Sequence, residues 1–220
     1  MVSAIQCEVL GFGADLPNGI LTKVNQFRKR VGRLELASAL GLQYMEYGKN
    51  REGYWGFKEF EEQVVDCMDV FEVMYPEKQL TFEVNHSTGH AKNREDGLHV
   101  GYMDVRYGGA QKVLRDTKLT EGCVGSLEVK MHPNKDKGST QFIKGVLWKR
   151  GLYVDGTSIA PGTPEERRFD LVLANLPDFK HEETALQHTV ESRGHILLMS
   201  PKYHPGVAGV GIEYSWGISK

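Results

Sequence analysis

The sequence predicts an α/β domain in which a sheet is layered against helices. Apolar residues recur every three or four positions over residues 57–75, which is the spacing of one buried helix face. Segments 80–84 and 195–199 have the length and apolar content of core strands. The predicted order along the chain is strand, helix, strand, irregular segment, helix, strand and helix, and such alternation is typical of the α/β class.

The N-terminal part is expected to contain a strand, a turn and a basic helix. The first fifteen or so residues have the pattern of a strand and a glycine-containing turn. Helical stretches follow between about residues 20 and 40, where Arg28, Lys29, Arg30 and Arg33 form a basic cluster. Such a cluster is either a solvated helix face or a contact for DNA phosphates, and the pattern alone leaves both open.

The middle of the chain contains the clearest helix and strand signals. The helix over residues 57–75 is ended by Pro76. Residues 80–84 alternate apolar and polar side chains and lead into a polar loop at 85–90. Residues from about 104 to 144 are rich in glycine and charge, with little periodicity. They are predicted to be an irregular insertion within a single domain that spans residues 1–220.

The C-terminal third returns to regular structure. Residues 146–154 form a short apolar segment, and 167–176 fit either a helix or a strand. A helix over 182–193 is expected to end at Gly194, and a second core strand follows at 195–199. A loop over 201–211 precedes a helix that begins near residue 212.

The composition fits one globular domain, with 40% hydrophobic and 25% charged residues. No apolar run is long enough to cross a bilayer, and the N-terminus lacks the pattern of a secretory signal. Cys7, Cys67 and Cys123 are widely spaced without a C-x-x-C motif, which favours a reducing compartment over a disulfide framework or a zinc knuckle. The net charge of −2 implies that any DNA-binding surface is local.

Two groups of residues could carry chemistry. Asn85 begins a polar loop directly after a core-type strand, where α/β sheets commonly place ligand sites, although an ordinary capped turn is the alternative. Glu213 lies near a predicted helix start, where the helix dipole favours a carboxylate, and a solvated glutamate is the alternative. The glycine-rich stretches lack the phosphate-loop and dinucleotide patterns, and no two histidines have H-E-x-x-H spacing.

Several segments, in the same order along nearly the whole chain, resemble DDE-type transposases of the mariner-like superfamily, in the large DDE endonuclease-like branch of eukaryotic mobile elements. These segments are residues 47–55, 82–90, 94–98, 177–179, 186–195 and 212–217. The resemblance implies an RNase H-like fold, with a mixed sheet flanked by helices and the N-terminal part of the core missing.

The resemblance also implies a site in which three acidic residues hold two Mg²⁺ or Mn²⁺ ions for attack of water or a DNA 3′-hydroxyl on a phosphodiester. Glu213 matches the third acidic residue, in an I-E-x-x-W-G setting. Asn85 stands where the second acidic residue normally lies, and the first would precede Met1. With one carboxylate of three, endonuclease and strand-transfer activity is expected to be lost or very weak.

By the same resemblance, the partner is double-stranded DNA at transposon ends, in the nucleus, with self-association and without a membrane. The helix-turn-helix domain that finds such ends is expected to be missing. The predicted nucleic-acid contacts are Arg28, Lys29, Arg30, His90, Lys149 and Arg150. Three alternatives to an inactive transposase-derived domain stay open: a DNA- or protein-binding remnant, a live nuclease that tolerates Asn85, and an unrelated small-molecule enzyme.

Overall fold

The computed structural model describes residues 2–7, 11–12, 19–37, 42–46, 48–51, 53–86, 89–105, 114–118, 128–129, 142–154, 156, 158 and 160–201. The chain forms two compact units. The first combines residues 1–92 with 186–220, and the second consists of residues 93–185. Helices and strands both occur, with a small parallel sheet, so the α/β class is confirmed.

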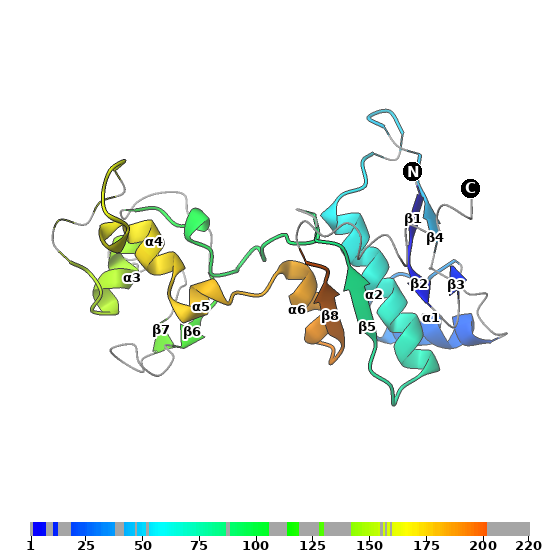
Figure 1. The fold of residues 1–220 in the computed structure, drawn as a ribbon. Coiled ribbons are helices and arrows are strands. Elements are labelled where there is room, and N and C mark those ends of the chain that lie inside the picture. Colours follow the sequence, from blue (N-terminus) through cyan, green and yellow to red (C-terminus); the bar gives the residue numbers. More distant parts are fainter. Residues whose placement is uncertain are drawn as a thin grey trace. The chain divides into compact units, whose positions relative to one another are not determined.

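The first unit contains three helices among its described residues, α1 (Ile20–Arg30), α2 (Phe57–Met74) and α6 (Ala185–Glu191), the last of which starts at the boundary of the unit (Figure 1). Strand β1 (Val2–Ala4) pairs antiparallel with β4 (Leu42–Tyr44), and β2 (Gln6–Cys7) with β3 (Gly11–Phe12). Strand β5 (Thr81–Val84) pairs parallel with β8 (Ile196–Met199). Within the described residues these pairs are separate, and they do not join into the mixed sheet that the sequence predicts.

The parallel pair β5–β8 forms one side of the hydrophobic core of the first unit. Phe82 and Val84 of β5 point into this core, whereas Thr81 and Glu83 on the opposite face are exposed. Helices α2 and α6 cover the inward face with Val64, Met68, Leu186 and Val190. Two-residue alternation on one strand and three- or four-residue spacing on the helices therefore place these buried apolar side chains in one cluster.

Helix α2 forms where its apolar stripe predicts, and both of its ends have local causes. At the N-terminus the Glu59 carboxylate accepts a hydrogen bond from the Gly56 N–H at 2.8 Å. The backbone N–H of Glu59 itself, and then that of Gly56, lowers the pKa of the Glu59 carboxyl by donating a hydrogen bond to it. The helix stops at Met74 because Pro76 cannot continue it.

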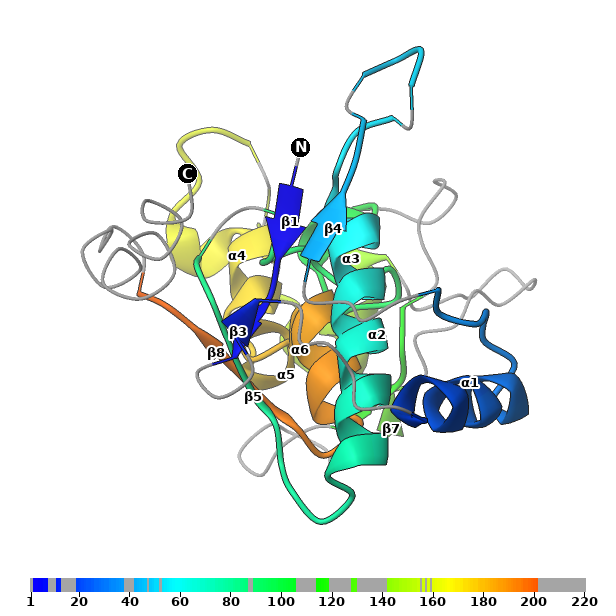
Figure 2. The same ribbon diagram turned by 90° about the vertical axis from the view of Figure 1, so that its right-hand side faces the viewer.

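A buried carboxylate ties α1 to α2. Asp69 of α2 is fully buried and accepts hydrogen bonds from Arg28 at 2.7 Å and Arg193 at 2.7 Å. Arg33, just beyond α1, is a third partner. A buried charge is tolerated only when it is paired, so these guanidinium groups hold the two helices together. Figures 1 and 2 both show α1 beside the C-terminal half of α2.

The second unit has its own core. It contains 3₁₀ helix η1 (Val100–Tyr102), strands β6 (Thr117–Lys118) and β7 (Glu128–Val129), helix α3 (Ile143–Lys149), 3₁₀ helix η2 (Glu165–Arg167), α4 (Phe169–Ala174) and α5 (Pro177–Lys180). Strands β6 and β7 pair antiparallel. The core is formed by Leu98, Met103, Leu114, Ile143, Val146, Leu147, Phe169, Leu173 and Phe179.

The chain enters and leaves this second unit at one place. Asn93 and Thr184 form an antiparallel bridge, and Arg94 donates to Glu183 at 2.5 Å. A nearby contact joins Arg115 to Glu182. The insertion predicted at about 104–144 lies inside this unit, and helix α3 begins within its last two residues.

Candidate functional site

The parallel pairing brings the C-terminal ends of β5 and β8 to the same edge. Val84 lies opposite Met199, and the Ser200 N–H donates to the Val84 carbonyl at 2.9 Å. Asn85 is the first residue beyond β5, and it is exposed. The polar loop and the segment that follows β8 therefore start side by side, at the edge where parallel sheets commonly bind ligands.

The loop after Asn85 is held against the first turns of α2. The Nδ1 of His90 lies 2.8 Å from the Asn85 carbonyl oxygen, and because a carbonyl can only accept, Nδ1 carries the proton in this hydrogen bond. The His90 ring stacks on Phe60 with ring centroids 4.4 Å apart. Lys92 lies over the Phe57 ring at 5.0 Å from its centroid. These contacts hold the C-terminal end of the loop on α2, and the hydrogen bond from His90 ties Asn85, at the start of the loop, to that end.

The described residues do not complete a metal site at this edge. Asn85 offers a neutral amide, which is a weaker ligand than a carboxylate for Mg²⁺. Glu213, the other predicted ligand, lies outside the described residues. Among the residues that the structure describes, no group of three His, Cys, Asp or Glu side chains could hold a metal ion. The predicted metal site therefore stays a prediction.

The basic cluster on α1 divides between two sides of the helix. Arg28, predicted to contact DNA, is instead buried, with only 5% of its surface exposed. Its guanidinium donates to Asp66 at 2.6 Å, to Asp69 and to the Leu34 carbonyl. A side chain placed in this way cannot reach a phosphate. Lys29 and Arg30 are exposed and remain candidates.

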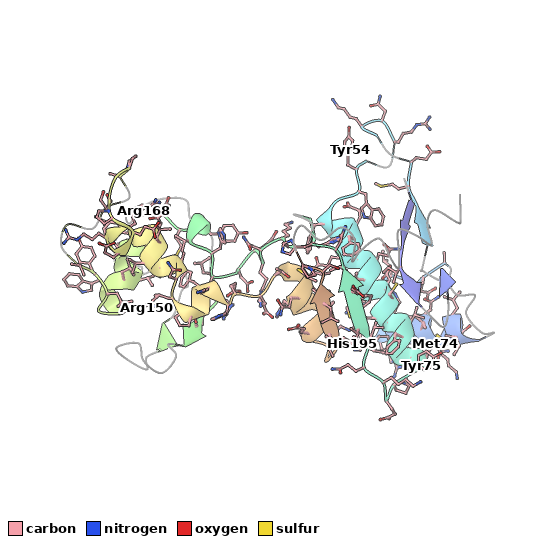
Figure 3. The ribbon with its side chains drawn as sticks, in the orientation of Figure 1. Tyr54, Met74, Tyr75, Arg150, Arg168 and His195 are labelled. Atoms are coloured by element: carbon pink, nitrogen blue, oxygen red, sulfur yellow. The ribbon has the colours of Figure 1, made fainter. Side chains whose placement is uncertain are left out.

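A similar correction applies to Arg150, at the C-terminus of α3 (Figure 3). This side chain is fully buried and donates two hydrogen bonds to Asp178, at 3.0 and 2.6 Å. Thr117 also donates to Asp178 at 3.0 Å. Arg150 therefore joins elements within the second unit and is not available to DNA. Lys149 lies in α3, and its side chain is outside the described part of the chain.

Two carboxyl groups that take part in ion pairs have shifted pKa values. Burial raises the pKa of Asp66, although its hydrogen bond to Arg28 opposes the shift. The hydrogen bond from Arg168 lowers the pKa of Asp170, and the two groups lie 2.5 Å apart. Both pairs are local structural contacts within their own units.

The second unit contains a cleft that no motif in the sequence predicts. The cleft has a volume of about 700 Å³ and an apolar lining that includes Leu98, Ile143 and Phe179. Arg168 and Lys180 contribute charge to it. The lining comes from separate stretches of the chain, 98–105, residue 143 and 168–180, so no single local motif marks it.

Comparison with protein-family models, curated proteins and solved structures finds no match for this chain. None of the helices in the described residues is sufficiently long and apolar to cross a membrane.

Proposed function

We propose that the chain is a transposase-derived DDE domain with an RNase H-like core, and that it no longer catalyses DNA cleavage or strand transfer. The proposal combines the ordered motifs in the sequence with one structural observation. The strand that precedes Asn85 and the strand that precedes the segment with Glu213 are direct parallel neighbours.

This arrangement supports the proposal because two ligand positions of one metal site must come from neighbouring parts of the fold. Strands β5 and β8 end at the same edge, so a short segment after β8 can return toward Asn85. The resemblance puts acidic residues at these two positions. Asn85 replaces one of them with a neutral amide, which weakens the charge stabilisation that two-metal chemistry needs.

The proposal predicts that an acidic residue at position 85 raises the affinity of the chain for cations, and that this gain depends on Glu213. We expect Asn85→Asp to bind Mn²⁺ or Tb³⁺ more tightly than the native chain does, because a carboxylate is the better ligand. The gain should disappear in the double variant Asn85→Asp/Glu213→Gln, and the coupling between the two changes measures their proximity. Luminescence of bound Tb³⁺ and titration calorimetry with Mn²⁺ both report this affinity.

Asn50→Asp is the matched control, because it adds the same charge at another exposed asparagine. Nicking of supercoiled plasmid with Mg²⁺ and then Mn²⁺ completes the test. The native chain is expected to leave the plasmid intact. Metal-dependent nicking that is lost in Glu213→Gln would contradict the proposed loss of catalysis, and an equal gain in Asn50→Asp and Asn85→Asp would contradict the site.

A further inference from the structure

Helix α1 has one face that consists only of polar and cationic side chains. Thr22, Lys23, Gln26, Lys29 and Arg30 are all exposed. At 3.6 residues per turn these positions fall within an arc of roughly 120°. The opposite side carries Val24, which is fully buried, and the inward-pointing Arg28.

The cations on this face have no acidic partner in the part of the chain that the structure describes. Helix α1 contains no acidic residue. Within the described residues, Lys23, Lys29 and Arg30 make no ion pair. Some exposed cations elsewhere do have an acidic partner, as Arg51 does with Glu46 at 2.8 Å. The chain as a whole is slightly acidic, so this face is a local concentration of positive charge.

Helix stability explains only part of this pattern. Lys29 and Arg30 lie in the last turn, where cations interact favourably with the helix dipole. Lys23 lies in the first turn and a half, where the same dipole opposes a cation. Its position on the same face as Lys29 and Arg30 therefore points to an external anion.

Hydrogen bonds on the inner side of α1 fix the position of its exposed face. Arg28 is bound to Asp66, Asp69 and the Leu34 carbonyl. The Asn25 side chain donates to the Leu36 carbonyl at 3.0 Å and accepts from the Leu36 N–H at 2.8 Å. Both contacts fix the segment after α1 against the helix, so little ordering is needed when the outer face binds a partner.

The chemistry of the face favours a nucleic acid over a lipid surface. A helix that lies in a membrane interface needs an exposed apolar side. The apolar side of α1 is occupied, because Val24 is buried where α1 packs on α2. Lysine, arginine, glutamine and threonine side chains are the usual donors to DNA phosphates.

We propose that the outer face of α1 binds the phosphate backbone of double-stranded DNA. Lys23, Lys29 and Arg30 contact the phosphates, and Thr22 and Gln26 donate hydrogen bonds beside them. Arg30 lies seven positions after Lys23, which is about 10 Å along a helix, and duplex DNA carries a charge about every 1.7 Å of its axis. Arg28 acts as a positioning residue. This inference deepens the proposed function, since it names the surface on which a transposase-derived domain retains DNA.

The test measures binding of the full chain to a fluorescent random-sequence duplex by anisotropy, in EDTA so that no cleavage can occur. Three phosphate contacts predict a slope of about −2.7 for log affinity against log salt, or roughly a fortyfold loss between 50 and 200 mM salt. The triple variant Lys23→Gln/Lys29→Gln/Arg30→Gln is expected to lose nearly all of this slope.

The control is Lys58→Gln/Lys78→Gln/Lys180→Gln, which removes the same charge from exposed lysines elsewhere. Equal losses in the two triple variants, or no binding by the native chain at 50 mM salt, would overturn the proposal. Acetylation of the native chain with and without duplex gives a second measurement that needs no variant. DNA should protect Lys23 and Lys29 but leave Lys58 reactive, and the reverse pattern would also overturn it. Neither result depends on metal binding at Asn85, so this surface and the proposed function can fail separately.

Discussion

Among single residues, Asp69 is central to the first unit. It is fully buried, yet Arg28, Arg33 and Arg193 supply it with positive charge from two separate stretches of the chain. Arg193 also contacts Glu72, which lies 3.1 Å from the Nε2 of His195. His195 itself lies beside the last turns of α2, with its ring edge-on to Phe71 (Figure 3). The sequence suggests that basic residues such as Arg28 lie on an outer surface. In the structure, Arg28, Arg33 and Arg193 instead join α1, α2 and the turn before β8.

Cys67, on α2, gives a prediction about reactivity. Burial raises the pKa of its thiol from 9.0 to about 12. Only the thiolate reacts with iodoacetamide, so at pH 9 the folded chain should be alkylated at Cys67 several hundredfold more slowly than the chain in urea. A Cys7→Ser/Cys123→Ser background makes the reaction report Cys67 alone.

The raised pKa of Cys67 also predicts that the folded state becomes less stable at high pH. The thiol keeps its proton more tightly in the folded state, so between pH 9 and about 12 the unfolded state loses the proton first. The contribution of Cys67 to stability is therefore fully present below pH 9 and is lost as pH rises through that window. Rapid alkylation of the folded chain at pH 9 would show that the thiol is not buried in this way.

At the level of elements, α6 holds the parallel strand pair through a small number of apolar contacts. Leu186 is fully buried against α2 and β5, whereas Leu198 on β8 is 51% exposed. We expect Leu186→Ala to lower the free energy of unfolding of the first unit by about 2–5 kcal/mol, because it leaves a cavity. Leu198→Ala removes the same atoms from a largely solvated position and should cost less than about 1 kcal/mol. Urea denaturation measures both, and similar losses would contradict the packing of α6.

Local patterns predicted the elements better than the contacts between them. Apolar periodicity placed the helix at 57–75 and the strand at 80–84, within one residue of α2 and β5 at each end. Residues 167–176 were ambiguous, and they form α4 because Phe169 and Leu173, four residues apart, both enter the second core. The inward turn of Arg28 could not be predicted, since its acidic partners lie 38 and 41 residues away in the sequence.

For the candidate site, the sequence located a polar loop after a core strand, and the structure places Asn85 there. His90 is held on α2 because its ring stacks on Phe60, which lies thirty residues earlier in the sequence. No local motif encodes such a contact. The division of the chain at residues 93 and 185 was also not visible, because the bridge between Asn93 and Thr184 joins positions far apart in the sequence.

Across the whole molecule, each unit has a separate apolar core and a separate buried ion pair. The first unit has Asp69 with its three arginines, and the second has Arg150 with Asp178. Buried pairs of this kind destabilise the surrounding structure strongly when one partner is removed, since the other is left as an uncompensated charge. Each pair therefore offers a means of weakening one unit alone.

Two matched variants test whether the units unfold independently. Asp69→Ala and Arg150→Ala are each expected to cost about 3–5 kcal/mol, because each leaves buried partners without their counter-charge. Hydrogen exchange followed by mass spectrometry should show faster exchange only in α1, α2 and β5 for Asp69→Ala, and only in α3, α4 and α5 for Arg150→Ala. If either variant accelerates exchange equally in both units, the chain unfolds as one cooperative domain, and the single-domain organisation predicted from the sequence describes its energetics.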